Sequence, residues 1–126
     1  MQLKKYADTD FFLALMKESD WLKEKAKKIY QENKGNIWVT PFTIVELMII
    51  CKRENIPMKE TIFQISRMVN LDSFEWEVLF ATVDYIEQGA TIFDSLLMSF
   101  CGKENSIISS DKVYAKFGFN VLDLKK

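Results

Sequence analysis

Two acidic residues lie in long stretches of otherwise uncharged sequence. Glu46 is the only charged residue between Lys34 and Lys52, and Asp94 is similarly isolated later in the chain. The residues three and four positions from each are mostly apolar, and on a helix such residues share the carboxylate's face. A carboxylate on an apolar face is costly to bury unless a cation, a backbone amide or an opposite charge accompanies it. The pattern therefore predicts that each of the two lies where such a partner can be bound.

Two further acidic residues stand where predicted strands end. Asp8 directly follows one short apolar run, and Asp111 follows another. Ligands of an open parallel sheet bind outside the carboxyl ends of its strands, and helices packed on the sheet can direct Glu46 and Asp94 to that edge. Four carboxylates gathered there would repel one another, and a divalent cation relieves that repulsion. We therefore expect Asp8, Glu46, Asp94 and Asp111 to bind a metal ion whose chemistry is hydrolysis of phosphodiesters by an activated water.

The composition restricts which chemistry is possible. The chain contains no histidine, which excludes serine–histidine–aspartate and cysteine–histidine catalysis and most zinc sites. Oxygen ligands remain, and they favour magnesium, manganese or calcium. Seventeen basic and eighteen acidic residues give a net charge of -1, so no overall positive field indicates nucleic-acid binding, although a local basic rim would suffice. The cysteines, Cys51 and Cys101, are expected as buried free thiols, which suits a cytoplasmic protein.

Short apolar runs alternate with helical patterns along the chain, which is typical of a parallel sheet covered by helices. We expect a three-layer α/β/α sandwich with a short central parallel sheet, formed by a single domain over residues 1–126. No uncharged apolar run approaches the ~20 residues that a membrane span needs, and no targeting segment is evident. The expected strands cover residues 3–7, 37–39, 106–109 and 120–124, with a short edge strand within 70–73. The expected helices cover residues 11–16, 20–34, 41–54, 58–69, 74–88, 91–101 and 112–117.

Several side chains are expected to have structural roles. Asp10 is predicted to cap the helix over residues 11–16 and is left outside the metal site. The helix over residues 41–54 is apolar nearly all round, so we expect it to be buried. The apolar segment 11–16, and Phe63 on a later helix, either cover a deep core or mark an interface.

Four segments, in order along the whole chain, resemble the motifs of PIN-domain nucleases. The segment Tyr6–Phe12 contains an aspartate followed by Thr and then Asp, which is similar to the first motif. The segment Thr40–Leu47 resembles the second, a helix with a central glutamate. The segment Ile92–Leu97 resembles the third, with Asp-Ser where Asp-Ala is more usual. The segment Ile107–Lys112, followed by a Phe-Gly pair, resembles the fourth.

The resemblance implies a Mg²⁺- or Mn²⁺-dependent ribonuclease whose acidic quartet is Asp8, Glu46, Asp94 and Asp111. Thr9 and Ser110 would support the quartet by hydrogen bonding to a carboxylate or to a metal-bound water. The size of the chain is that of the toxin of VapBC toxin–antitoxin pairs, which implies a homodimer and a cognate antitoxin. Family members often carry a further acidic residue after the fourth motif, and this chain has Val113 and Tyr114 there.

Other interpretations remain open from the sequence. The chain fits an RNA-processing PIN nuclease without an antitoxin, or a catalytically silent PIN-like module that binds RNA or protein. A receiver-like regulatory domain would also have an acidic pocket at strand ends, but it leaves Glu46 and Asp94 unexplained. Taken singly, Asp8 also suits a helix cap and Asp111 a turn. The lysines near the expected cleft either meet RNA phosphates or form an ordinary solvated surface; they are Lys4, Lys5, Lys112, Lys116, Lys125 and Lys126.

Overall fold

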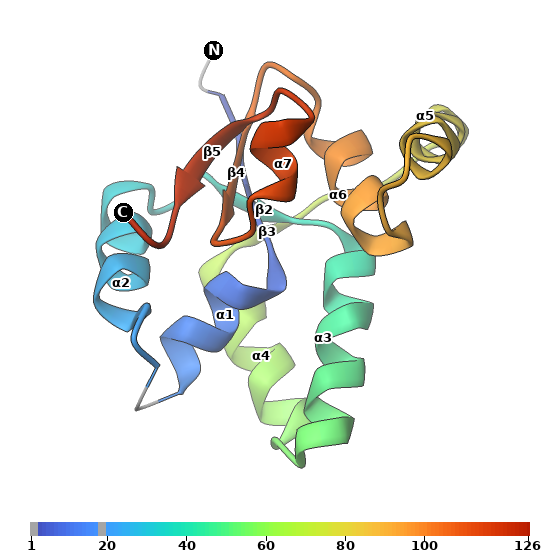
Figure 1. The fold of residues 1–126 in the computed structure, drawn as a ribbon. Coiled ribbons are helices and arrows are strands. Elements are labelled where there is room, and N and C mark those ends of the chain that lie inside the picture. Colours follow the sequence, from blue (N-terminus) through green and yellow to red (C-terminus); the bar gives the residue numbers. More distant parts are fainter. Residues whose placement is uncertain (1–2, 18–19) are drawn as a thin grey trace.

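A five-stranded parallel sheet forms the centre of the protein (Figure 1). The computed structural model describes residues 3–17 and 20–126. The strand order is β3-β2-β1-β4-β5, and every neighbouring pair is parallel. The strands are β1 (Lys5–Ala7), β2 (Ile37–Val39), β3 (Asn70–Leu71), β4 (Ser106–Ser109) and β5 (Asn120–Asp123).

Alternate residues of the strands enter two separate cores, one on each face of the sheet. Tyr6 and Ile107 belong to one core, while their neighbours Ala7 and Ile108 belong to the other. Helices α1–α4 supply the core that contains Ala7, and α5–α7 supply the core that contains Tyr6. This alternation is the period of two that places successive strand side chains on opposite faces. The predicted three-layer α/β/α architecture is confirmed.

The helices follow the sequence signals closely. Thr40 caps α3 through its hydroxyl, which accepts a hydrogen bond from the amide of Thr43 at 2.9 Å, and Pro41 occupies the first helical position. Thr91 caps α6 in the same way. The helices are α1 (Thr9–Met16), α2 (Lys23–Glu32), α3 (Pro41–Glu54), α4 (Met58–Met68), α5 (Trp76–Glu87), α6 (Ile92–Cys101) and α7 (Val113–Lys116).

The predicted cap of α1 is wrong. The helix begins at Thr9, and Asp8 is its N-cap, with extended backbone (φ -84°, ψ 167°) and a carboxylate that accepts the Thr9 amide. Asp10 lies in the first turn, and its carboxylate instead accepts hydrogen bonds from Ser110 across the sheet edge. Asp8 thus follows β1 directly and also caps α1, so no turn separates the strand from the helix.

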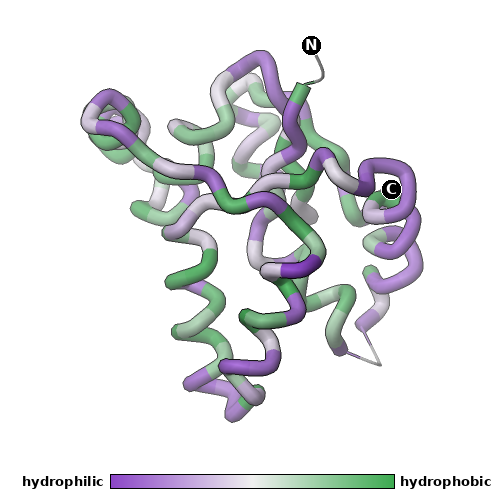
Figure 2. Tube along the Cα trace, turned by 180° about the vertical axis from the view of Figure 1, so that it is seen from behind, coloured by the Kyte–Doolittle hydropathy of each residue, from purple (hydrophilic) through white to green (hydrophobic). Residues whose placement is uncertain are grey.

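The expected burial of α3 is also wrong for one of its faces. The helix is coloured hydrophobic over most of its length (Figure 2), yet Val45, Met48 and Ile49 are exposed. Its inner face carries the buried Thr43 and Leu47. The sequence pattern overstated burial because an apolar helix outside a sheet can have an apolar outer face as well.

The apolar segment 11–16 and Phe63, each expected to cover the core or to mark an interface, differ in burial. Phe11, Phe12 and Ala14 of α1 are buried, and the remaining apolar residues of α1 pack against them, so this segment covers the core. Phe63 on α4 is 60% exposed. Both cysteines are buried free thiols, as expected. None of the helices in the described part of the chain is long and apolar enough to cross a bilayer.

The order of strands reverses beside β1, which lies between β2 and β4. The chain moves outward from β1 through β2 to β3, and then returns to place β4 on the other side of β1. Such a reversal leaves an open crevice at the carboxyl ends of the two central strands, because their connections leave in opposite directions. The register pairs Ala7 with Ile108, so Asp8 and Ser109 leave the sheet side by side at this crevice.

Candidate active site

A pocket of about 490 Å³ opens at the crevice beside β1 and β4. All four acidic residues singled out in the sequence line it, together with the two residues expected to support them. A fifth acidic residue, Asp10, and two lysines complete the wall. The full lining is Asp8, Thr9, Asp10, Glu46, Asp94, Ser110, Asp111, Lys112 and Lys125.

Asp8 is held by three hydrogen bonds from three different elements. Its Oδ1 accepts the amide of Thr9 at 2.8 Å. Its Oδ2 accepts the hydroxyl of Ser109 at 2.9 Å and that of Tyr114 at 2.9 Å. The start of α1, the end of β4 and α7 therefore fix one carboxylate, so the position of Asp8 is defined by the fold rather than by its own rotamer freedom.

Tyr114 also joins Asp8 to Asp94. Its hydroxyl is 3.0 Å from Asp94 Oδ1 and 2.9 Å from Asp8 Oδ2, and its side chain is fully buried. A phenol has one hydrogen to donate, so it cannot donate fully to two ionised carboxylates at once. The bridge is complete only when one of the two acids carries a proton, or when the single hydrogen alternates between them.

The loop after β4 is tied to α1. The amide of Ser110 donates to Asp10 Oδ2 at 2.8 Å, and the Ser110 hydroxyl donates to the same oxygen. The Ser109 hydroxyl accepts the amide of Asp111 at 3.0 Å, and Asp111 Oδ1 accepts the amide of Val113 at 3.0 Å. Asp111 is therefore both a turn residue and part of the pocket wall, so the two readings of this residue hold together.

The residues from 5 to 120 match the family model of the PIN domain. The chain belongs to the PIN domain family. This membership confirms the resemblance drawn from the four sequence motifs, and the match spans every acidic residue of the pocket.

Solved structures with the same fold include proteins of toxin–antitoxin systems. A toxin–antitoxin complex from Klebsiella pneumoniae is 14% identical, with a TM-score of 0.76 over 96% of this chain and 98% of that one. The sarcin–ricin-loop-cleaving toxin VapC20 of Mycobacterium tuberculosis is 13% identical, with a TM-score of 0.76 over 92% and 96% of the two chains. DNA-bound VapBC from Salmonella typhimurium is 13% identical, with a TM-score of 0.72 over 98% and 99%. No protein of curated function matches the sequence.

Burial and neighbouring charges raise the pKa values of three acids of this PIN domain: Asp8, Asp10 and Glu46. Burial, reinforced by the charge of Asp10, raises the pKa of Asp8 to about 7, although its three hydrogen bonds act in the opposite direction. Burial also raises the pKa of Asp10, which Ser110 partly offsets. For Glu46, burial and then the charge of Asp94 raise the pKa, and the Thr9 side chain lowers it. The acids thus influence one another as a group, which is the repulsion expected at this edge.

The donor set fits a divalent cation. No ion pair among residues 3–17 and 20–126 involves a carboxylate of the pocket. Asp10 Oδ1 is buried and has no hydrogen-bond partner. A buried carboxylate oxygen left without a partner is costly, and a cation or a water in its shell would satisfy it. The groups of the pocket that could bind a cation are carboxylate and hydroxyl oxygens, the ligands that Mg²⁺ and Mn²⁺ prefer.

The carboxylates do not form a closed cage. In the described part of the chain, no three acidic or cysteine side chains are close enough together to enclose an ion by themselves. Mg²⁺ typically keeps several waters and takes only one or two protein carboxylates, with substrate phosphate completing its shell.

Three residues of the pocket region were missed in the sequence. Ser109 holds Asp8, Asp10 holds Ser110, and Tyr114 joins Asp8 to Asp94. The role of Ser109 follows from the register of β1 with β4, which no local pattern gives. Tyr114 lies in the segment where family members often carry a further acidic residue. This difference from the family pattern was the sequence signal that could have drawn attention to Tyr114.

The Tyr114 bridge predicts a shift in the pH dependence of metal binding. The hydroxyl stabilises the ionised form of Asp8, so Tyr114→Phe should raise the Asp8 pKa and move the midpoint of Mn²⁺ binding up by roughly one pH unit. Calorimetric titration with Mn²⁺ across the pH range measures the midpoint. Tyr85→Phe is the matched control, since its ring packs on Phe117 and Phe119. An unchanged midpoint in Tyr114→Phe would contradict the bridge.

The raised pKa of Asp8 predicts that the metal-free protein loses stability as the pH rises. Between the ordinary value of 3.8 and about 7, the folded protein binds more protons at Asp8 than the unfolded chain does. The free energy of unfolding should therefore fall from about pH 4 to about pH 7 and then level off. Millimolar Mg²⁺ should restore stability at higher pH, because it binds the ionised folded site.

Urea denaturation at several pH values, with Mg²⁺ or with EDTA, measures this dependence. Asp8→Asn should flatten the profile and remove most of the Mg²⁺ effect. The exposed Asp84→Asn, on α5, is the control and should leave both unchanged. A stability that rises with pH in EDTA would show that another group dominates.

Proposed function

We propose that this PIN domain is a metal-dependent ribonuclease and the toxin of a VapBC-type toxin–antitoxin pair. Asp8, Glu46, Asp94 and Asp111 form its acidic quartet and hold Mg²⁺ or Mn²⁺, and Thr9 and Ser110 support them. The observation that carries the proposal is the convergence of five carboxylates from different elements on one pocket with no ion-pair partner in the described structure. Family membership and the toxins of the same fold agree with it.

The residues of the chain have distinct tasks in this proposal. A bound metal ion supplies an activated water and stabilises charge at the leaving oxygen of the cleaved phosphodiester. Asp8 provides a fixed carboxylate, since three donors hold it. Glu46 and Asp94 form the helical walls, and Asp111 contributes from the loop after β4. Ser110 keeps Asp10, and with it the start of α1, against that loop.

The carboxylates also control when RNA can enter the pocket. A bare phosphate is repelled by them, so RNA approaches productively only when cations occupy the pocket. Lys112 and Lys125 lie in the same wall and offer positive charge to the phosphates beside the cut. The absence of histidine leaves a carboxylate or bulk water as the proton acceptor.

Exposed apolar side chains support protein partners. On α5, Trp76, Phe80 and Val83 are 73%, 69% and 49% exposed. Their spacing puts them on one stripe of the helix, the pattern of a helix that packs against another element. We assign this stripe to self-association as a homodimer, and the exposed face of α3 leaves a second apolar surface for a cognate antitoxin. The same proposal places the protein in the cytoplasm and treats residues 1–126 as a single domain.

An RNA cleavage assay tests the activity. The purified protein should cut single-stranded or structured RNA with Mn²⁺ or Mg²⁺ and not with EDTA. Asp8→Asn should slow cleavage at least about 100-fold, because it removes a charged metal ligand on which the site depends. The control Asp84→Asn, purified identically, should cut at the rate of the unaltered protein. Cleavage that persists in EDTA, or that Asp8→Asn leaves intact, would overturn the proposal.

A solution mass measurement tests the dimer. The unaltered chain of 14.8 kDa should elute with twice that mass in light scattering, and Phe80→Lys should give the monomer. A charge placed in the centre of an apolar interface leaves it buried and unpaired, which is strongly unfavourable. Phe63→Lys, another exposed phenylalanine on α4, is the matched control and should remain dimeric. The opposite result would move the interface to α4.

A further inference from the structure

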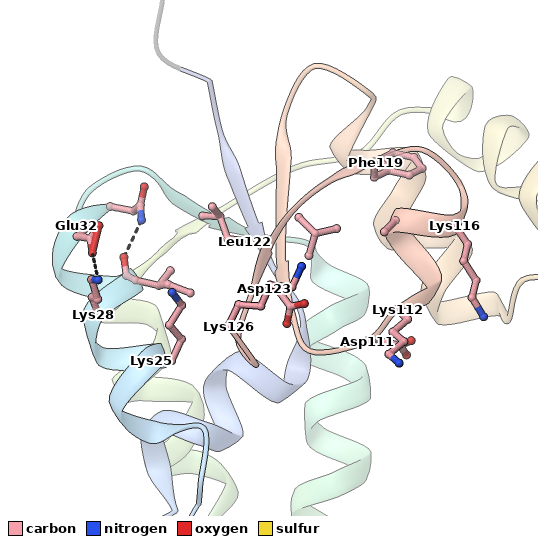
Figure 3. Close-up of a pocket in the computed structure, with 14 residues that line it drawn as sticks. Lys25, Lys28, Glu32, Asp111, Lys112, Lys116, Phe119, Leu122, Asp123 and Lys126 are labelled. Carbon is pink, nitrogen blue, oxygen red and sulfur yellow. Dashed lines mark hydrogen bonds and ion pairs between the residues drawn. The ribbon is translucent and has the colours of Figure 1, made fainter.

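A second, larger hollow lies beside the acidic pocket. It has a volume of about 750 Å³ and runs between α2 and the segment from Asp111 to Lys126. Figure 3 shows side chains of α2 on one side of it, Lys116 of α7 on the other, and Leu122 and Asp123 of β5 between them. We call it the lysine groove, after the five lysines in its walls: Lys25, Lys28, Lys112, Lys116 and Lys126.

The lysine groove has an excess of positive charge. Three acidic residues also line it, and one of them, Glu32, lies 3.9 Å from Lys28. Another, Asp111, belongs to the acidic pocket as well. In the part of the chain that the structure describes, Lys25 and Lys116 have no carboxylate within ion-pair distance. Two cations on opposite walls are therefore available to a bound anion.

The lysine groove and the acidic pocket share a wall. Asp111 and Lys112 line both of them. A molecule lying along the groove would reach the carboxylates without leaving the surface. The groove can therefore hold the negative charges of a bound polyanion beside the pocket. The pocket itself can accept a negative charge only when metal ions occupy it.

The floor of the lysine groove is apolar. It consists of the half-buried Val121 and Leu122 of the edge strand β5, with the more deeply buried Ile29 of α2 and Phe119 beside them. Proteins that bind single-stranded nucleic acid combine positive charge along the backbone with apolar or aromatic surface against the bases. An acidic peptide would use the lysines but would leave this floor uncovered.

We propose that the lysine groove binds the single-stranded RNA that flanks the cleaved phosphodiester, with Lys25 and Lys116 on its phosphates and its bases over the apolar floor. This inference rests on the proposed ribonuclease function and names the path of its substrate. The RNA passes from the groove over Asp111 and Lys112 into the acidic pocket. Affinity for long RNA then resides in the groove, and cleavage resides in the carboxylates.

The test separates binding from cleavage. Fluorescence anisotropy with a labelled single-stranded RNA is measured on Asp8→Asn, which keeps the groove intact, at several salt concentrations. Adding Lys25→Gln and Lys116→Gln should weaken binding about tenfold and reduce the slope of log affinity against log salt by about 1.4, for two phosphate contacts on a single strand. The matched control adds Lys52→Gln and Lys59→Gln, two exposed helical lysines outside the groove, and should change affinity less than about twofold.

Cleavage kinetics then distinguish the groove from the activity. In the otherwise unaltered chain, the groove substitutions should raise KM for long RNA and leave the cleavage rate of a trinucleotide unchanged, since it is too short to occupy the groove. If the groove variants bind and cut long RNA as the control does, the proposal that the lysine groove binds RNA is wrong, while the ribonuclease proposal stands. An unaltered chain that cuts no RNA would overturn the ribonuclease proposal, and RNA binding would still report on the groove.

Binding of a poly-glutamate peptide tests the alternative that the groove binds an acidic peptide. If the peptide binds through Lys25 and Lys116 and labelled RNA does not, the groove is a peptide site and the proposal is wrong. Circular dichroism and thermal denaturation of each variant confirm that lost binding is not lost folding.

Discussion

Negative charges crowd the carboxyl edge of the sheet, and much of the surrounding structure offsets their repulsion. Asp8 lies at the amino end of α1 and Asp94 in the first turn of α6, where the unpaired helix amides and the helix dipole favour negative charge. Hydroxyl groups of Ser109, Ser110 and Tyr114 supply further donors. These contributions are dipoles and not charges, so they reduce the repulsion without cancelling it. The remaining negative charge gives the pocket a potential that attracts cations and repels anions.

The parallel sheet is what makes this crowding possible. Reversal of strand order beside β1 opens a crevice there, and the short loops at the strand ends leave their side chains close together. The two helices that carry Glu46 and Asp94 come from opposite faces of the sheet, α3 from one and α6 from the other. An antiparallel arrangement would send alternate strand ends to the opposite edge and separate the acids. The fold and the site therefore depend on the same feature of strand direction.

The sequence predicts the elements well where local signals are strong. The Thr40–Pro41 start of α3 and the glycine that follows α6 at Gly102 need only neighbouring residues to be recognised. The isolated charges of Glu46 and Asp94 likewise indicate their place in the pocket. The predicted cap of α1 lies two residues too late, because Asp8 and Asp10 are both good caps and only the end of β1 decides between them. The exposed face of α3 escaped prediction because apolar composition reports the chance of burial and not the presence of a neighbour.

The hydrogen bonds of the site were harder to predict because they join distant segments. Ser109 could be assigned to Asp8 only by knowing that β4 pairs with β1 in that register. In the sequence, Asp10 looks like the solvated aspartates elsewhere in the chain. The loop after β4 covers it, and that contact is not visible from neighbouring residues. Tyr114 resembles a core aromatic until its hydroxyl is placed between two carboxylates.

These distant hydrogen bonds also determine when the site can form during folding. Asp8 meets Ser109 and Tyr114 across separations of 101 and 106 residues, so synthesis must have passed Tyr114 before its carboxylate has both partners. Contacts of such long range close late, because the entropy of a large loop must be overcome first. A nascent chain that ends before β4 has β1 at the edge of the sheet and Asp8 open to water. The site therefore forms only once β4 and α7 have joined the fold.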